Sequence, residues 1–158
     1  MIAKPGVQEK ILLHLLDYAD FKEKVEVPFS LSQMGIANAV AIARSNVPRA
    51  ISGLRDQGLL VERQAHVHGV SRKRKAYFLT DSGIIAAEET WERLRQFQFR
   101  CIGSDGEALS TTLGAAHEVL PFAMRPVDII RYLDDNLILD VRPLTEDLIE
   151  RDLSKQVE

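Results

Sequence analysis

Two short segments with helical patterning, residues 32–40 and 44–57, are separated by only three residues, and this spacing restricts the fold more than any other feature. Ser32 stands where its hydroxyl can accept a hydrogen bond from an unpaired amide in the first turn of a helix. The second segment carries one apolar stripe at three- and four-residue steps, formed by Val47, Ala50, Ile51 and Leu54. The pattern therefore predicts a helix, a sharp break around Ala41 and Ile42, and a second helix.

Pro48 lies early in the second of these helices. It is compatible with a helix if it falls in the first turn, where the missing amide hydrogen has no intrahelical acceptor to lose. We therefore expect Ser45 to cap this helix and Gly58 to end it.

The flanking segments complete an alternation of helices and strands. Residues 7–21 have the apolar periodicity of an amphipathic helix. Two strand-like segments, 59–67 and 73–79, are joined by a turn at 68–71, which predicts a β-hairpin. Thr80 or Asp81 then caps a helix that continues to about residue 97. Residues 1–97 are thus predicted as one domain, mostly α with a small β-hairpin.

The remaining residues, 98–158, are predicted to form a small α/β extension. Pro121 ends one predicted helix, and Pro126 suits the first turn of the next. The predicted elements are a strand at 97–102, a turn at 103–106, helices at 107–120 and 126–135, a strand at 137–141, and a segment from Thr145 that is either a last helix or frayed.

Charge is unevenly distributed along the 158 residues, whose net charge is −3. Residues 1–96 hold 14 basic and 11 acidic residues, a net charge of +3. Residues 97–158 hold 6 basic and 12 acidic residues, a net charge of −6. Residues 44–75 alone hold 8 basic and 2 acidic residues, a net charge of +6. One short segment therefore creates a local positive field in an otherwise acidic chain, which is the distribution that matters for nucleic-acid binding.

The motifs within this order resemble those of the MarR-like transcription regulators. They read Ser32-Gln-Met-Gly-Ile-Ala37, Val40-Ala-Ile-Ala-Arg-Ser-Asn-Val-Pro-Arg49 and Leu54-Arg-Asp-Gln-Gly-Leu-Leu-Val61. The chain is also similar to archaeal winged-helix proteins with Val-Pro-Arg-Ala in the recognition helix and an Arg/Lys run in the wing. The resemblance covers about 90 residues and implies a winged helix-turn-helix that binds double-stranded DNA and regulates transcription. Two positions depart from the pattern: Ala41 replaces the usual turn glycine, and Ala43 replaces the usual capping serine.

In such a fold the helix at 44–57 lies in the major groove and reads bases near its N-terminal end. Because its apolar stripe faces the core, the outward side chains are Arg44, Ser45, Asn46, Arg49 and Ser52. Arg49 suits a bidentate contact with guanine and Asn46 one with adenine, each worth roughly 1–3 kcal/mol of discrimination. The alternative is that these are solvated polar residues on a surface helix.

The basic wing, residues 66–75, ends in the run Arg72, Lys73, Arg74 and Lys75. Such a run at a hairpin tip suits phosphates or an adjacent minor groove. The alternative is a solvated edge strand, in which charges block unwanted pairing. Ser32 and Arg44, near helix N-termini, are expected to add phosphate contacts.

Several other classes of site are not indicated by the sequence. Cys101 is the only cysteine, and His66 and His68 have no further ligands at metal spacing, although they suit a phosphate contact. No catalytic motif is present, so we expect no enzyme activity and no cofactor. His14 is expected to be an ordinary surface or boundary histidine. The sequence lacks a membrane span and a secretory signal, which favours a cytoplasmic protein.

The helix at 81–97 carries Trp91 on an apolar face, in the place where many winged-helix regulators have a dimerisation helix. We therefore expect a homodimer that binds two half-sites about one DNA turn apart. The acidic residues 98–158 are expected to pair protomers, receive a signal or bind a protein partner. The alternative function is a protein–protein adaptor that does not bind DNA, because winged helices also serve that role.

Overall fold

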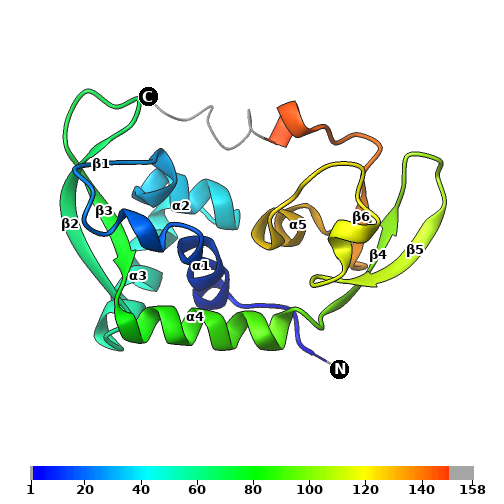
Figure 1. Cartoon of the computed structure of the whole chain (residues 1–158), viewed down its shortest axis with the longest axis horizontal. Helices are drawn as coiled ribbons and strands as arrows, with labels where there is room; N and C mark the ends of the chain where they lie inside the picture. Colours follow the sequence, from blue (N-terminus) through cyan, green and yellow to red (C-terminus); the bar gives the residue numbers. More distant parts are fainter. Residues whose placement is uncertain (1, 150–158) are drawn as a thin grey trace.

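The computed structural model describes residues 2–149, which form two units joined by helix α4 (Asp81–Leu94) (Figure 1). The N-terminal unit contains helices α1 to α3 and strands β1 to β3. The C-terminal unit contains strands β4 to β6 and helix α5. In Figure 1 the β2–β3 hairpin lies at one end of the molecule and β5 at the other, with α4 running along both units.

The helix–break–helix predicted from the sequence consists of α2 (Gln33–Val40), η3 (Arg44–Asn46) and α3 (Val47–Asp56). Ser32 caps α2 as predicted, since its Oγ accepts from the amide of Gly35 at 3.1 Å. Ala41 ends α2 in the left-handed conformation, with φ 57° and ψ 50°. The turn therefore keeps the geometry that glycine usually supplies, although a side chain disfavours it.

The first predicted helix is shorter than its apolar pattern indicates. Helix α1 (Val7–Leu16) ends five residues before the predicted range does, and a 3₁₀ turn, η1 (Ala19–Phe21), follows it. The connection to α2 then passes through strand β1 (Glu26–Val27) and a second 3₁₀ turn, η2 (Phe29–Leu31).

The wing is a three-stranded sheet in the order β1-β2-β3. Strands β2 (Leu60–Val67) and β3 (Arg74–Leu79) form the predicted antiparallel hairpin, and β1, which the sequence did not indicate, pairs in parallel with the end of β2. The alternating pattern predicted for β3 is absent because its last four residues, Ala76 to Leu79, are all buried. This order of helices and strands is that of a winged helix, as the sequence predicted.

Helix α4 begins where the wing ends. Thr80 is its N-cap, accepting from the amide of Gly83 at 3.0 Å and donating to the carbonyl of Gly58 at 2.7 Å. Gly83 allows this close approach, because a Cβ there would lie 1.8 Å from the carbonyl oxygen of Leu59. The start of α4 is therefore fixed against the loop that follows α3.

The C-terminal unit is a three-stranded sheet in the order β5-β4-β6, packed on one helix. The predicted strands are β4 (Gln98–Ile102) and β6 (Ile138–Asp140), and the predicted helix at 126–135 is α5 (Pro126–Tyr132). The helix predicted at 107–120 is wrong: this segment contains strand β5 (Ala108–Thr112) and a 3₁₀ turn, η4 (Ala116–Glu118). Of the predicted segment from Thr145, residues 146–149 are helical, Thr145 itself is not, and residues 150–158 lie outside the described residues.

The two units have separate hydrophobic cores that share helices. The first core lies among α1, α2, α3 and the wing, and also contains Val127 from α5. The second core lies between α5 and the β4–β6 sheet, and also contains Leu13 from α1 and Leu94 from α4. Each unit therefore completes the core of the other.

A buried polar cluster at this junction corrects the prediction for His14, which is completely buried rather than on the surface. One of its ring nitrogens, Nε2, lies 2.7 Å from the carbonyl oxygen of Ser30. The other, Nδ1, lies 3.0 Å from the guanidinium of Arg125, which also forms an ion pair with Asp17 at 2.8 Å. Because arginine can only donate, Nδ1 accepts and Nε2 carries the proton, so the ring is neutral.

Burial lowers the pKa of His14 to about 3, and the neighbouring positive charge of Arg125 acts in the same direction. Burial has the opposite effect on Asp128 of α5, whose pKa is raised. The histidine escaped the sequence prediction because the arginine that covers it is 111 residues away in the chain.

Candidate nucleic-acid interface

The predicted recognition helix begins with a 3₁₀ turn rather than with an α-helical cap. Ser45 lies inside η3, so its predicted capping role is wrong; Asn46 is the N-cap of α3 and forms no side-chain cap. The amide of Asn46 bonds instead to the carbonyl of Ala43 at 2.9 Å, which closes the turn. Pro48 falls in the first turn of α3, as predicted.

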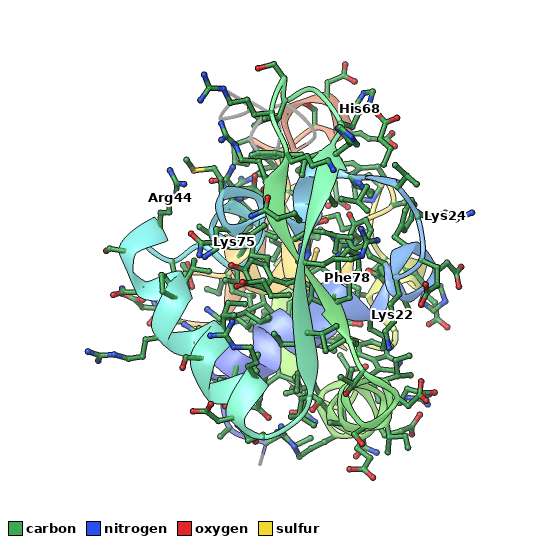
Figure 2. All side chains as sticks on the ribbon, turned by 90° about the vertical axis from the view of Figure 1, so that its left-hand side faces the viewer. Lys22, Lys24, Arg44, His68, Lys75 and Phe78 are labelled. Carbon is green, nitrogen blue, oxygen red and sulfur yellow. The ribbon has the colours of Figure 1, made fainter. Side chains whose placement is uncertain are left out.

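The orientation of α3 agrees with the apolar stripe read from the sequence. Val47, Ala50, Ile51 and Leu54 are buried. The polar residues that were predicted to face outward do so: Ser52 is half-buried, and the exposed ones are Arg44, Ser45, Asn46 and Arg49. Figure 2 shows Arg44 projecting from the start of this helix, away from the body of the molecule.

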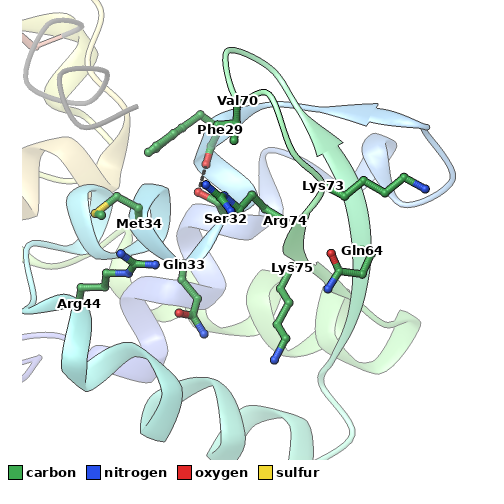
Figure 3. A pocket seen from close by; sticks show the side chains of 10 residues that line it. All are labelled: Phe29, Ser32, Gln33, Met34, Arg44, Gln64, Val70, Lys73, Arg74 and Lys75. Atoms are coloured by element: carbon green, nitrogen blue, oxygen red, sulfur yellow. Dashed lines mark hydrogen bonds between the residues drawn. The ribbon is translucent and has the colours of Figure 1, made fainter. Parts of the chain in front are cut away.

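The four basic residues of the wing are all exposed, but they do not lie on one side of the hairpin. Figure 3 shows Arg74 and Lys75 next to α2 and η3, whereas Lys73 points to the opposite side. Within residues 2–149, Lys75 is the one residue of these four that forms an ion pair. Its Nζ lies 3.9 Å from a carboxylate oxygen of Glu62. Arg72, Lys73 and Arg74 therefore remain available to an external anion.

A groove separates the wing from the N-terminal ends of α2 and η3 (Figure 3). It contains no acidic side chain among the described residues that line it, and four of them are basic: Arg44, Lys73, Arg74 and Lys75. The isolated bridge between Ser32 and Ala76 brings the start of α2 directly against β3. Gln33 also connects the two elements by donating to the hydroxyl of Tyr77 at 3.0 Å.

Ser32 also lies in this groove, but its hydroxyl is already used. The residue is buried, and its Oγ donates to the carbonyl of Phe29 at 2.7 Å while it accepts from Gly35. Its place in the structure is therefore that of a helix cap at the floor of the groove.

Two lysines that the sequence prediction missed lie on the other side of the wing. Lys22 and Lys24 line a second hollow together with His66, Lys73 and one acidic residue, Glu23. Arg63 of β2 fixes the loop that carries them, because its guanidinium donates to the carbonyls of Phe21, Lys22 and Lys24. The guanidinium also lies 4.4 Å from the centre of the Phe78 ring. In the sequence these lysines alternate with acidic residues, so they do not stand out as a basic run. The pairing of β1 with β2 brings them next to the wing.

The histidine pair of the wing is exposed. His68 Nδ1 lies 3.1 Å from a carboxylate oxygen of Glu26, whereas His66 lines the second hollow. Residues 2–149 contain no group of three or more histidine, cysteine, aspartate or glutamate side chains that could hold a metal ion.

No protein-family model matches the chain, and no curated protein matches it. Among solved structures the chain is similar to a point mutant of ZitR from Lactococcus lactis, with 20% sequence identity and a TM-score of 0.42. The match covers 58% of this chain and 53% of that one, so it spans about half the length of the ZitR structure. Within residues 2–149, no helix has both the length and the apolar character to cross a membrane.

Proposed function

We propose that the chain is a DNA-binding transcription regulator that places α3 in the major groove and the wing on the phosphate backbone or in the adjacent minor groove. The observation that carries the proposal is the groove between α2, η3 and the wing, to which Arg44, Arg74 and Lys75 contribute positive charge and whose described lining contains no acidic side chain. Arginine and lysine on both elements suit the phosphates of a duplex, which supply most of the non-specific affinity. The localisation that agrees with this role is the cytoplasm.

Within this proposal the exposed residues of η3 and α3 divide into two roles. Arg49 and Asn46 face away from the core and are proposed to contact base edges, since both can form bidentate pairs. Arg44 lines the groove and is proposed to bind phosphate, with Ser45 and Ser52 adding weaker contacts.

On the wing, the basic run is proposed to bind phosphates on both sides of the hairpin. Arg74 and Lys75 face the recognition helix. Lys73 lines both hollows, and its side chain points to the opposite side, where Lys22 and Lys24 lie. A duplex that follows the wing would therefore meet positive charge before and after the hairpin, which extends the interface beyond the residues predicted from sequence.

The experiment measures binding of a fluorescent random duplex as a function of salt concentration. Replacing Arg72, Lys73, Arg74 and Lys75 with alanine should abolish most of the binding. If each residue neutralises one phosphate, the slope of log K against log salt should fall by about 3 to 4. Unchanged binding by this variant would contradict the role of the wing.

A matched pair of double variants separates a local contact from a change in net charge. Arg74→Ala with Lys75→Ala removes two positive charges from the groove, and Arg95→Ala with Arg100→Ala removes two from exposed positions near the C-terminal unit. Only the first pair should reduce affinity and slope. Equal losses would indicate a non-specific charge effect, and weak binding by the native chain even at low salt would favour the protein–protein adaptor.

A further inference from the structure

The C-terminal sheet has one edge that no strand covers. Strand β5 pairs with β4 on one side, and within residues 2–149 no strand pairs with its other side. In Figure 1 this strand forms the outer border of the molecule, at the end opposite the wing. A row of unpaired backbone groups of this kind is a template for adding another strand.

The pairing with β4 determines which backbone groups point outward. The amide of Gly103 donates to the carbonyl of Glu107, and that of Leu113 donates to the carbonyl of Phe97. Hydrogen-bonded pairs alternate along an antiparallel ladder, so Leu109 and Thr111 also direct their amides and carbonyls toward β4. The amides of the intervening residues, Ala108, Ser110 and Thr112, therefore face the open edge. The carbonyls of Ala108 and Ser110 do so too, whereas that of Thr112 accepts from the amide of Ala115 at 3.2 Å.

The composition of β5 lacks the devices that normally prevent edge pairing. Its residues, Ala-Leu-Ser-Thr-Thr, include no charge and no proline. The hairpin strand β3, by contrast, begins with Arg74 and Lys75. Leu109 of β5 is 54% exposed, although it lies beside Cys101 on the side of the sheet that is otherwise buried. An uncharged edge with an exposed leucine favours pairing with another strand.

We propose that the occupant of this edge is β5 of a second copy of the chain, paired in antiparallel orientation about a two-fold axis at Ser110. In this register Ser110 faces Ser110 of the partner subunit, and Ala108 faces Thr112 of the partner subunit. In each copy the amides of Ser110 and Thr112 then meet unengaged carbonyls of the partner subunit, those of Ser110 and Ala108, so four backbone hydrogen bonds join the two strands. The two sheets become one continuous sheet.

The side chains agree with this register. Leu109 faces Thr111 of the partner subunit, an aliphatic and a β-branched residue of the kind that stabilises cross-strand pairs. No charged residue of β5 meets its own copy across the axis, because the strand has none.

The alternative surface, α4, is less suited to pairing. Its apolar face packs on α1 and on the second core, where Leu94 is buried and Trp91 is partly buried. Ile85 is its large exposed apolar residue, and the exposed residues around it are mainly charged.

This assembly does not rest on the proposed DNA binding, and it is tested without DNA. It nevertheless changes the geometry expected of a dimer. Because β5 and the wing lie at opposite ends of each copy, the two recognition helices would lie at the far ends of the pair (Figure 1). Such a dimer suits two separated DNA segments rather than two half-sites one turn apart.

The first test is the mass of the full chain in solution, measured by sedimentation at concentrations up to about 100 µM, where an interface of moderate affinity is populated. The native chain should show twice the 17.8 kDa of one copy. Ser110→Pro removes an outward amide without removing a bond to β4, and Leu109→Lys adds a charge to the edge. Both variants should sediment as single copies, whereas the matched control Ser110→Ala should remain paired.

Circular dichroism reports whether each variant is folded, and Leu109→Lys tests the edge if Ser110→Pro does not fold. A single-copy mass for the native chain across this range would overturn the proposal. A pair that persists in folded Leu109→Lys would also overturn it.

The second test traps the register. Residues in a hydrogen-bonded antiparallel pair have Cα atoms about 5.5 Å apart, which is within the range for a disulfide. Ser110→Cys should therefore form a cross-linked pair under mild oxidation, since the native Cys101 is buried. Ser82→Cys, at an exposed position on α4, is the control. Equal cross-linking of both variants, or none at residue 110, would refute the two-fold axis at Ser110.

Discussion

The buried histidine at the junction of the two units makes stability depend on pH in a way that can be calculated. The pKa of His14 is about 3 in the folded chain and has its ordinary value of 6.5 in the unfolded chain. Between these values the unfolded chain binds the proton and the folded chain does not. The contribution of the neutral His14 ring to the free energy of unfolding is therefore present in full above about pH 6.5, and it is lost as the pH falls toward 3.

The size of the effect follows from the two pKa values. Below about pH 6 the free energy of unfolding should fall by about 1.4 kcal/mol per pH unit from this residue alone. Between pH 7 and pH 5 the loss should be about 2 kcal/mol. Asp128 works in the opposite direction, because its raised pKa means that the folded chain holds a proton more readily than the unfolded chain.

The assay is urea unfolding at several pH values between 5 and 7.5, applied to the native chain and to His14→Gln. Glutamine keeps a donor for the carbonyl of Ser30 but cannot be protonated. The variant should therefore be less stable than the native chain by about 1 kcal/mol at pH 7, and its free energy of unfolding should fall less as the pH is lowered. The difference between the two chains removes the contribution of Asp128. His117→Gln, at an exposed position, controls for the loss of a histidine. The same slope in the native chain and His14→Gln would refute a neutral buried ring.

Three further predictions concern the turn, the wing junction and base recognition. Ala41→Gly should raise the free energy of unfolding by about 1 kcal/mol, because glycine adopts the left-handed conformation without strain; a lower urea midpoint would contradict this. Gly83→Ala should lower it by about 3 kcal/mol, since the new methyl overlaps the carbonyl oxygen of Leu59, and an unchanged midpoint would show that the helix shifts freely. Arg49→Ala should weaken binding to a sequence selected from a random duplex pool by about 1–3 kcal/mol while changing binding to random duplex much less; equal losses would assign Arg49 to phosphate.

The winged helix was predictable because its signals are local. The capping serine at residue 32, the apolar stripe of α3 and the turn between β2 and β3 each lie within a few residues of the structure they determine. The helix predicted at 107–120 failed because Glu107, Ala108 and Leu109 favour a helix locally, whereas pairing with β4 across the turn at 103–106 decides the outcome. Strand formation of this kind depends on a partner and on burial rather than on the segment itself.

The candidate interface was likewise predictable where its signals are local in the sequence. The exposed residues of α3 and the basic run of the wing follow from periodicity and charge. Lys22 and Lys24 were missed because the carbonyls around them are held by Arg63, about 40 residues away. Which basic residues of the wing face α2 and which face away also depends on how α2 packs against β3. The alternation of side chains along a strand does not indicate this packing.

The exchange of residues between the two cores has a consequence for how this protein can be used. A fragment that ends at residue 97, the predicted domain boundary, would leave Leu13 and Leu94 facing water and would remove Val127 from the first core. It would also remove Arg125, which covers His14. We therefore expect that the winged helix does not fold stably on its own. A fusion or reporter that uses it should contain the chain at least through α5 and β6.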